Sequence, residues 1–199
     1  MLQPSAPKIT ANRHKANTLP LRLPNSSIMD SLYRELRIVF GQGEQPEERA
    51  LVVWDGFDQP TKEDAVRFYS GKSWPDVLAH LRKLKDEPVF RGAYFLEEWS
   101  VLSPGALAYY ARAHLDFLPE TLAGTQRNEE FPFYFLGQLY QVFYMHKGTP
   151  FTSVQTSLLR RLVEWLAEMA TTPGTFEYYA ADIKLQAEKV LTEMRAHEA

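Results

Sequence analysis

Residues 152–169, TSVQTSLLRRLVEWLAEM, indicate the fold class more clearly than any other stretch of the chain. Thr152 and Gln155 have the spacing of a capping box, in which each side chain binds the backbone N–H of the other residue. Beyond the cap, large apolar side chains recur every three or four residues, so one helix face is apolar. This face consists of Leu158, Leu162, Trp165, Leu166 and Met169. The segment therefore predicts a helix packed against a core.

Similar patterns recur along the chain and predict further helices. We expect them from Ile28 to a stop at Gly41, from Pro60 to a stop at Gly71, from Ser73 through Leu84, from Pro104 to about Phe117, over 131–145 and over 176–196. At 199 residues, the chain has the length of one domain. The expected fold is mainly α, a single-domain helical bundle of about seven helices, with a short strand near 51–54 or 93–99.

Caps and prolines set the expected helix boundaries. Proline lacks the N–H that continues a helix, so Pro119 is expected to end the helix that begins at Pro104. Starts are expected where a capping residue precedes an apolar run. These capping residues are Ser27, Thr61, Ser73 and Ser103.

Charge divides the chain into two parts. Residues 1–27 contain four basic residues and no acidic one, together with four prolines, which is typical of a solvated basic arm. The remaining domain, 28–199, has 18 basic and 25 acidic residues, a net charge of −7. An acidic body does not suit nucleic acid, so a nucleic-acid role rests on the arm alone. No apolar run is long enough for a membrane span or a signal peptide, and the expected location is the cytoplasm.

Sequence motifs provide no cofactor site. The chain has no cysteine, which excludes disulfides, thiolate zinc sites and a cysteine nucleophile. Gly71-Lys72-Ser73 resembles the end of a phosphate-binding loop, but such a loop needs a glycine where Val66 stands. No two histidines have the spacing of a local metal pair. We therefore predict no cofactor and no metal, and the balance favours a protein that is not an enzyme.

In an enzymatic interpretation, the catalytic base would be a glutamate or the candidate His114. His114 lies four residues after Tyr110 and joins the apolar face of its helix. One interpretation is a buried base, and the other is a core histidine bonded to a carbonyl group. The first leads to the alternative function, a small-molecule-binding protein or hydrolytic enzyme with an aromatic-lined pocket. That pocket would be lined by Tyr109, Tyr110, His114, Tyr134 and Tyr140.

Aromatic residues are concentrated between Phe131 and Tyr144, which hold seven of the 26 in the chain. Two interpretations stay open here: a helix at the centre of the core, or a surface that binds a partner. The apolar seam of 176–196 poses a similar question, because it suits either this core or a homodimer. Candidate ligand or partner contacts are Trp74, Tyr109, Tyr110, Tyr134, Tyr140 and Tyr144.

Three short motifs resemble those of a family of small bacterial proteins classified only as a domain of unknown function. They are Gly71-Lys72-x-Trp74, Leu102-Ser103-Pro104-x-Ala106-x-x-Tyr109-Tyr110, and Gln155 before an apolar helix. The resemblance covers about residues 60–170. It departs at Arg112, where the family often has proline. It implies a bacterial origin and a compact helical unit, and it brings no reaction, cofactor or functional residue.

The favoured function is that of a cytoplasmic, non-enzymatic protein that binds another protein. Its size and acidity suggest an accessory or immunity-like role. This interpretation rests on the aromatic segment and on the failure of every catalytic motif. It predicts an apolar patch on the surface.

Overall fold

The computed structural model describes residues 26–53, 59–85, 99–123, 129–146, 150–176 and 178–197. Within them the fold is mainly α, as predicted, with seven α-helices and two 3-10 helices. The α-helices are α1 (Ser26–Val39), α2 (Gln59–Tyr69), α3 (Trp74–Lys85), α5 (Pro104–Leu122), α6 (Glu130–Met145), α7 (Ser153–Thr171) and α8 (Ala180–Ala196). The 3-10 helices are η1 (Glu48–Ala50) and η2 (Trp99–Val101).

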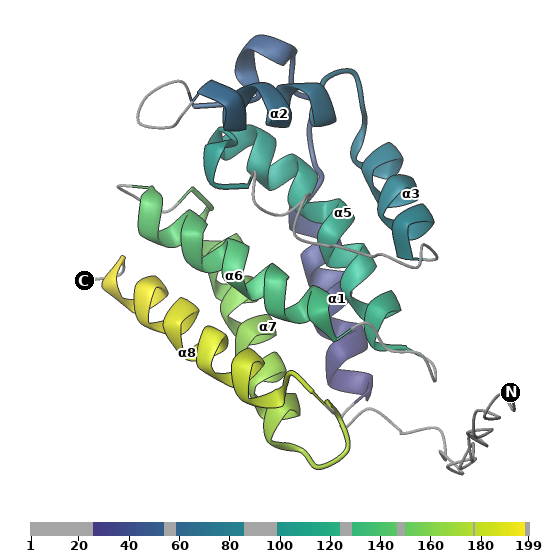
Figure 1. The fold of residues 1–199 in the computed structure, drawn as a ribbon, viewed down its shortest axis with the longest axis vertical. Coiled ribbons are helices and arrows are strands. Elements are labelled where there is room, and N and C mark those ends of the chain that lie inside the picture. Colours follow the sequence, from purple (N-terminus) through teal and green to yellow (C-terminus); the bar gives the residue numbers. More distant parts are fainter. Residues whose placement is uncertain are drawn as a thin grey trace, which may run out of the picture.

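Two groups of helices make up the bundle (Figure 1). In one group, α8 packs against both α6 and α7, and in the other, α5 packs against α3 and α1. The groups meet where α1 contacts α7 and where α5 contacts α6. α2 lies at the end of the molecule where α5 begins, and it contacts η2.

The core is rich in aromatic side chains, which accounts for part of the aromatic excess in the composition. The ring of Trp99, from η2, lies 5.7 Å from that of Phe135 on α6. The ring of Phe117, on α5, lies edge-on to that of Phe131, 4.8 Å away. Aromatic pairs of this geometry add to the stabilisation from burial alone. α5 is buried along most of its length and contacts helices of both groups.

The capping box of α7 is confirmed. The Gln155 N–H donates to Thr152 Oγ1 over 3.3 Å, and the Thr152 N–H donates to Gln155 Oε1 over 3.0 Å. The amide of Gln155 also donates to the carbonyl of Val39 over 2.9 Å, which ties the start of α7 to the end of α1. Ser103 likewise caps α5, accepting from the Ala106 N–H. All five residues of the predicted α7 face are buried.

The predicted stop at Pro119 is wrong, because α5 continues to Leu122 with the proline inside it. Proline removes one helical hydrogen bond, and burial beyond it outweighs that loss. Leu122 is buried, as is Thr121, whose hydroxyl donates to the Leu118 carbonyl over 2.7 Å. The burial of this last turn depends on its place in the bundle, so local sequence did not predict it.

Other helix boundaries also differ from the expectation. α1 begins at Ser26, so the last two residues of the expected arm 1–27 are helical, and residues 1–25 lie outside the described part. α2 begins at Gln59, which places Thr61 within the helix rather than at its cap. α8 begins at Ala180 rather than 176, since the Glu129 carboxylate accepts from the backbone N–H of Tyr178 and of Tyr179.

The expected strand near 51–54 is reduced to a single antiparallel bridge between Val52 and Leu102. Residue 54 and most of the alternative segment, 93–98, lie outside the described part, and Trp99 belongs to η2. The predicted apolar seam of 176–196 is largely buried, and α8 packs against α6 and α7. Five of its residues are buried, Phe176, Ile183, Ala187, Val190 and Met194, and Tyr179 is half-buried. This seam therefore serves the core of its own chain and is not free to pair with a second copy.

Candidate functional site

The aromatic side chains of α6 divide between the core and the surface. The fully buried ones are phenylalanines: Phe131, Phe135 and Phe143. Of the tyrosines, Tyr134 and Tyr140 are half-buried and pack against the edge of the core, whereas Tyr144 is 61% exposed. The interpretation as a core helix is therefore confirmed for the face with the phenylalanines, while a partner-binding surface stays a prediction for the face with the tyrosines. We call the outward side the α6 outer face, defined as Tyr134, Tyr140, Gln141, Tyr144 and Met145.

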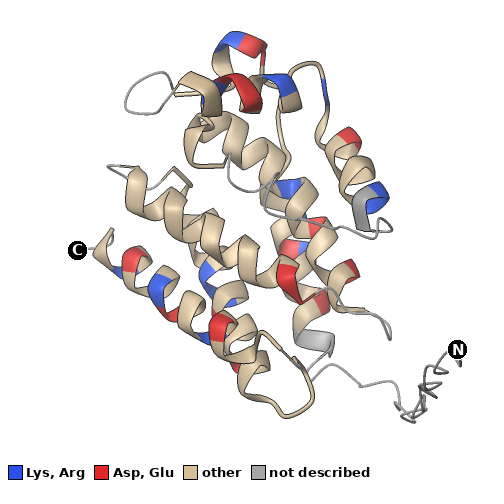
Figure 2. Cartoon of the chain, in the orientation of Figure 1, with Lys and Arg blue, Asp and Glu red and all other residues tan. Residues whose placement is uncertain are grey.

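The α6 outer face has an ordered aromatic pair and no charge. The rings of Tyr140 and Tyr144 stack with centroids 5.7 Å apart and planes inclined by 19°. Met145 next to them is 43% exposed. Within α6 only Glu130, its first residue, is charged, so the rest of the helix is tan in Figure 2. The hydroxyl groups of its tyrosines have no hydrogen-bond partner among the described residues.

Tyr109 and Tyr110, two of the candidate contacts, are instead structural. Both are buried in α5, and the Tyr110 hydroxyl donates to the carbonyls of Lys72 at 2.8 Å and Tyr69 at 3.2 Å. These bonds fix the turn between α2 and α3. Burial, the main cause, raises the pKa of Tyr110 to about 12. Trp74 is half-buried, with the Arg112 guanidinium 4.7 Å from the centre of its ring.

His114 lies in the core and not in a pocket. It has no exposed surface, its Nδ1 lies 3.3 Å from the Tyr110 carbonyl oxygen, and its ring meets that of Trp99 edge-on at 4.8 Å. Tyr134 and Tyr140, the half-buried tyrosines of the expected pocket, pack against the edge of the core. Neither of the two depressions described below is lined by any of the five residues of that pocket. The alternative function therefore gains no support from these depressions.

A polar cluster that the sequence analysis did not predict lies between α1 and α5. Asp116 is buried and accepts from the Nε of Arg112 and from the Nε of Arg37, both over 2.8 Å. Arg112 also donates to the backbone carbonyls of Arg37 and Phe40. Arg112 and Asp116 are four residues apart on one helix, and this spacing could have predicted their ion pair. Arg112, the position at which the sequence departs from the family pattern, therefore links α1 to α5.

Tyr33 on α1 belongs to the same cluster. Its hydroxyl is buried and has no hydrogen-bond partner among the described residues. Burial raises the pKa of Tyr33, and the negative charge of Asp116 raises it further. This phenol therefore stays protonated near neutral pH.

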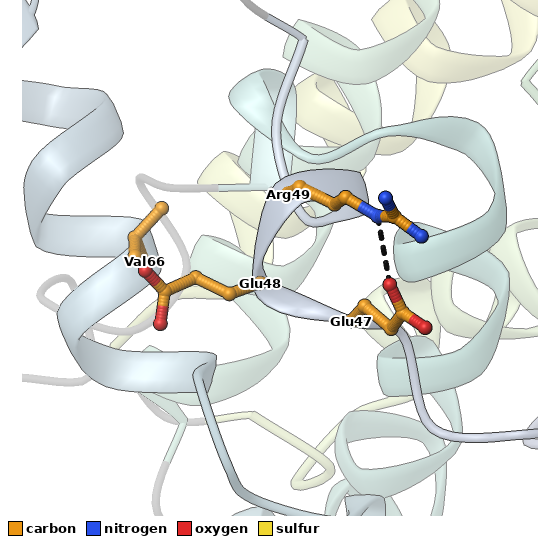
Figure 3. A pocket seen from close by; sticks show the side chains of 4 residues that line it. All are labelled: Glu47, Glu48, Arg49 and Val66. Atoms are coloured by element: carbon orange, nitrogen blue, oxygen red, sulfur yellow. Dashed lines mark ion pairs between the residues drawn. The ribbon is translucent and has the colours of Figure 1, made fainter.

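One open depression of about 720 Å³ lies between η1 and α2, as Figure 3 shows. Arg49 binds Glu47 over 2.8 Å, and Glu48 extends toward Val66 and accepts from the hydroxyl of Ser70. Each charged group of the depression thus has a partner within it or beside it. The described residues contain no group of three side chains suited to a metal ion.

A second depression of about 440 Å³ is a groove between two helices, which we call the α1–α7 groove. Its walls are Glu35, Ile38 and Val39 from α1, and Ser153, Val154, Ser157, Leu158 and Arg161 from α7. Ile38 and Val154 are both more than half exposed. None of the candidate residues named from the sequence lines this groove.

Comparisons with protein-family models, with curated proteins and with solved structures return no match to this chain. The resemblance to the bacterial family therefore stays a prediction, and the functional argument rests on the geometry. In the part of the chain that the structure describes, no helix has both the length and the apolarity to cross a membrane.

Proposed function

We propose that this chain is a non-enzymatic accessory protein that binds another protein through the α6 outer face, and that it does so in the cytoplasm. The observation that carries the proposal is the uncharged, tyrosine-rich surface of α6. Tyr144 and Met145 are among the few large apolar side chains that the described part of the chain exposes.

The composition of this face supports a protein partner. Tyrosine and methionine are enriched at protein interfaces, and charged residues are depleted at their centres. Tyr140 and Tyr144 are already ordered by stacking, so binding costs little side-chain entropy. Their hydroxyl groups are available to a partner's hydrogen-bonding groups, while their rings provide apolar contact area. A small-molecule site has less support, since neither depression described above is lined by a residue of this face.

Site-specific photo-cross-linking tests this proposal. The full-length chain would carry a benzophenone amino acid at position 144 in the cells from which the sequence comes. We expect a discrete cross-linked species, lost when Tyr140→Glu is added, because a carboxylate at the centre of an interface is costly to desolvate.

Leu185 is the matched control position. It is 53% exposed on α8 and lies outside the α6 outer face. A probe there should give no such species. Equal cross-linking from positions 185 and 144, or none from position 144, would contradict binding through α6.

A further inference from the structure

The α1–α7 groove has exposed apolar rims that the helical bundle leaves uncovered. Two of the large apolar side chains that the described part of the chain exposes line this one groove. These are Ile38, 65% exposed, and Val154, 56% exposed. In the same groove Leu158 is buried and Val39 is half-buried, so the floor is apolar as well. Contact of these groups with water is unfavourable, so an apolar segment within reach would be stabilised by covering them.

The groove leads toward the point where the described chain begins. Near the end of α1, the Val39 carbonyl accepts from the amide of Gln155. One turn earlier in α1, Glu35 pairs with Arg161, which comes later in α7, so the two helices are antiparallel. The start of α1 and the end of α7 both lie at the end of the molecule away from α2 (Figure 1). A segment that precedes Ser26 can therefore turn back and run between the two helices into the groove.

The length of chain before Ser26 suits this path. Ile38 comes 12 residues after Ser26, and a helix rises about 1.5 Å per residue, so the two are about 18 Å apart along α1. An extended chain covers about 3.3 Å per residue, so about six residues return from Ser26 to the level of Ile38. Counted back from Ser26, that distance ends at residues 19–21. Residues 1–25 lie outside the described part and are long enough to reach the groove.

The end of this arm has the chemistry of a segment that covers an apolar groove. Residues 19–24 are Leu-Pro-Leu-Arg-Leu-Pro, with leucine at every second position. Alternate side chains of an extended segment lie on one side, so the three leucines can face the groove together. Leu19 and Leu23 each precede a proline, which favours extended backbone at both positions. No other part of residues 1–25 repeats this alternation.

Charge favours the same path. Glu164 and Glu168 follow Arg161 at helical spacing, so they continue the α7 wall of the groove toward the start of α1. Both are exposed, and neither has an ion pair with a described residue. Arg34 on α1 is exposed and likewise has no ion pair there, so unpaired acids outnumber unpaired bases two to one among these three residues. The arm has only basic charges, and its Arg22 comes four residues before Ser26, within reach of these acids.

The covalent link favours this segment over any separate molecule. A short flexible link holds a segment at an effective concentration on the order of millimolar beside its site. A contact of a few apolar side chains, too weak to join two separate proteins, can therefore be occupied for much of the time within one chain. Another protein, or a second copy, would have to displace it from a much lower concentration.

We propose that residues 19–24 fold back along α1 and cover the α1–α7 groove of their own chain. The three leucines lie against Ile38 and Val154, and Arg22 lies beside the unpaired acids of α7. This contact goes beyond the proposed function, because the α6 outer face shares no residue with the groove.

Thiol labelling in the full chain tests this contact. The chain has no cysteine, so Ser157→Cys introduces a single thiol in the groove wall with little change in side-chain size. A maleimide should react there at least about threefold more slowly than when Leu19→Ser, Leu21→Ser and Leu23→Ser are also present, because the leucines hold the arm over the thiol. Leu185→Cys, 53% exposed on α8, is the control and should react at one rate with or without the three serines.

A charge exchange tests the direction of the arm. Arg22→Glu should speed the labelling of the Ser157→Cys chain, because it places an acid beside the acids of α7. Adding Glu164→Lys and Glu168→Lys should slow the labelling again, because opposite charges then face each other once more. Labelling that stays fast after this exchange would overturn the path along α7.

Two further results would overturn the proposal. One is equal labelling at position 157 with and without the three serines, which would mean that the arm leaves the groove open. The other is protection that disappears on dilution, because a segment of the same chain covers its groove at any concentration. A second copy would then be the covering surface. The photo-cross-link from position 144 reports on the proposed function separately, so the two ideas can fail independently.

Discussion

α5 and α6 are neighbouring apolar helices that use their polar atoms in opposite ways. In α5, the Tyr110 hydroxyl and the Asp116 carboxylate are buried and bonded to other elements of the same chain. In α6, Tyr140 is half-buried and Tyr144 is largely exposed, and their hydroxyl groups bond to no described residue. Both helices carry tyrosines, Tyr109 and Tyr110 in α5 and Tyr134, Tyr140 and Tyr144 in α6, but of these five only Tyr144 is largely exposed.

The difference teaches which polar groups hold the fold and which are free for binding. A buried polar group is costly unless it is bonded, so the partners of α5 are part of its stability. An exposed hydroxyl is satisfied by water, so its removal costs little in the free protein. Mutations in the two helices should therefore separate stability from binding.

The largest loss of stability is expected from Asp116→Ala in α5. It leaves Arg112, whose side chain is only 14% exposed, without its ion-pair partner. Loss of one member of a buried pair is strongly destabilising, and we expect the free energy of unfolding to fall by about 3 kcal/mol. Urea denaturation measures this change.

Glu120→Ala is the matched control on the same helix. Its ion pair with Arg82 is more exposed, so its loss should cost no more than about 1 kcal/mol. If Asp116→Ala were as mild as Glu120→Ala, the cluster between α1 and α5 would not hold the two helices together.

A second, smaller effect is expected where the chain after α1 approaches α5. Gly41 has a φ of +73°, and a Cβ there would lie 2.8 Å from both Cβ and Cγ of Arg112. Gly41→Ala should cost about 2 kcal/mol, from backbone strain and from the clash. Gly43→Ala has the same kind of backbone, φ +88°, with open space around it, and should cost about 1 kcal/mol. Equal losses in thermal or urea denaturation would mean that Arg112 moves aside freely.

The smallest loss of stability is expected from removing one tyrosine hydroxyl in each of the two helices. Tyr110→Phe removes the hydroxyl proton that is shared between the carbonyls of Lys72 and Tyr69, and it should cost about 1 kcal/mol, whereas Tyr144→Phe should stay within about 0.5 kcal/mol of the parent. The pKa of Tyr110 is raised to about 12 in the folded state, against 10 in the unfolded chain. The resulting stabilisation is complete below pH 10 and is lost as the pH rises toward 12.

Urea denaturation at a series of alkaline pH values tests whether stability falls as the pH rises. Tyr110→Phe should reduce the fall in stability between pH 10 and 12, though not abolish it, because the pKa of Tyr33 is raised as well. The comparison of α5 with α6 would fail if Tyr110→Phe and Tyr144→Phe cost the same stability.

Local sequence determined the helices and most of their ends. The capping box at Thr152, the cap at Ser103 and the stop at Gly41 depend on residues a few positions apart, so they could be predicted directly. Periodicity also identified the buried face of α7 and the seam of α8. Hydrophobic spacing therefore specified a mainly α bundle and the residues that face inward.

Tertiary structure decided what those faces meet. Burial of Leu122 carried α5 past Pro119, and the distant carboxylate of Glu129 set the start of α8. The ion pair of Asp116 with Arg37 and the α1–α7 groove both join residues far apart in the sequence. The packing of α6 likewise decides which of its aromatic residues are buried. Composition shows that an aromatic or an acid is present, but its exposure depends on which helices pack beside it, and that arrangement exists only in the folded chain.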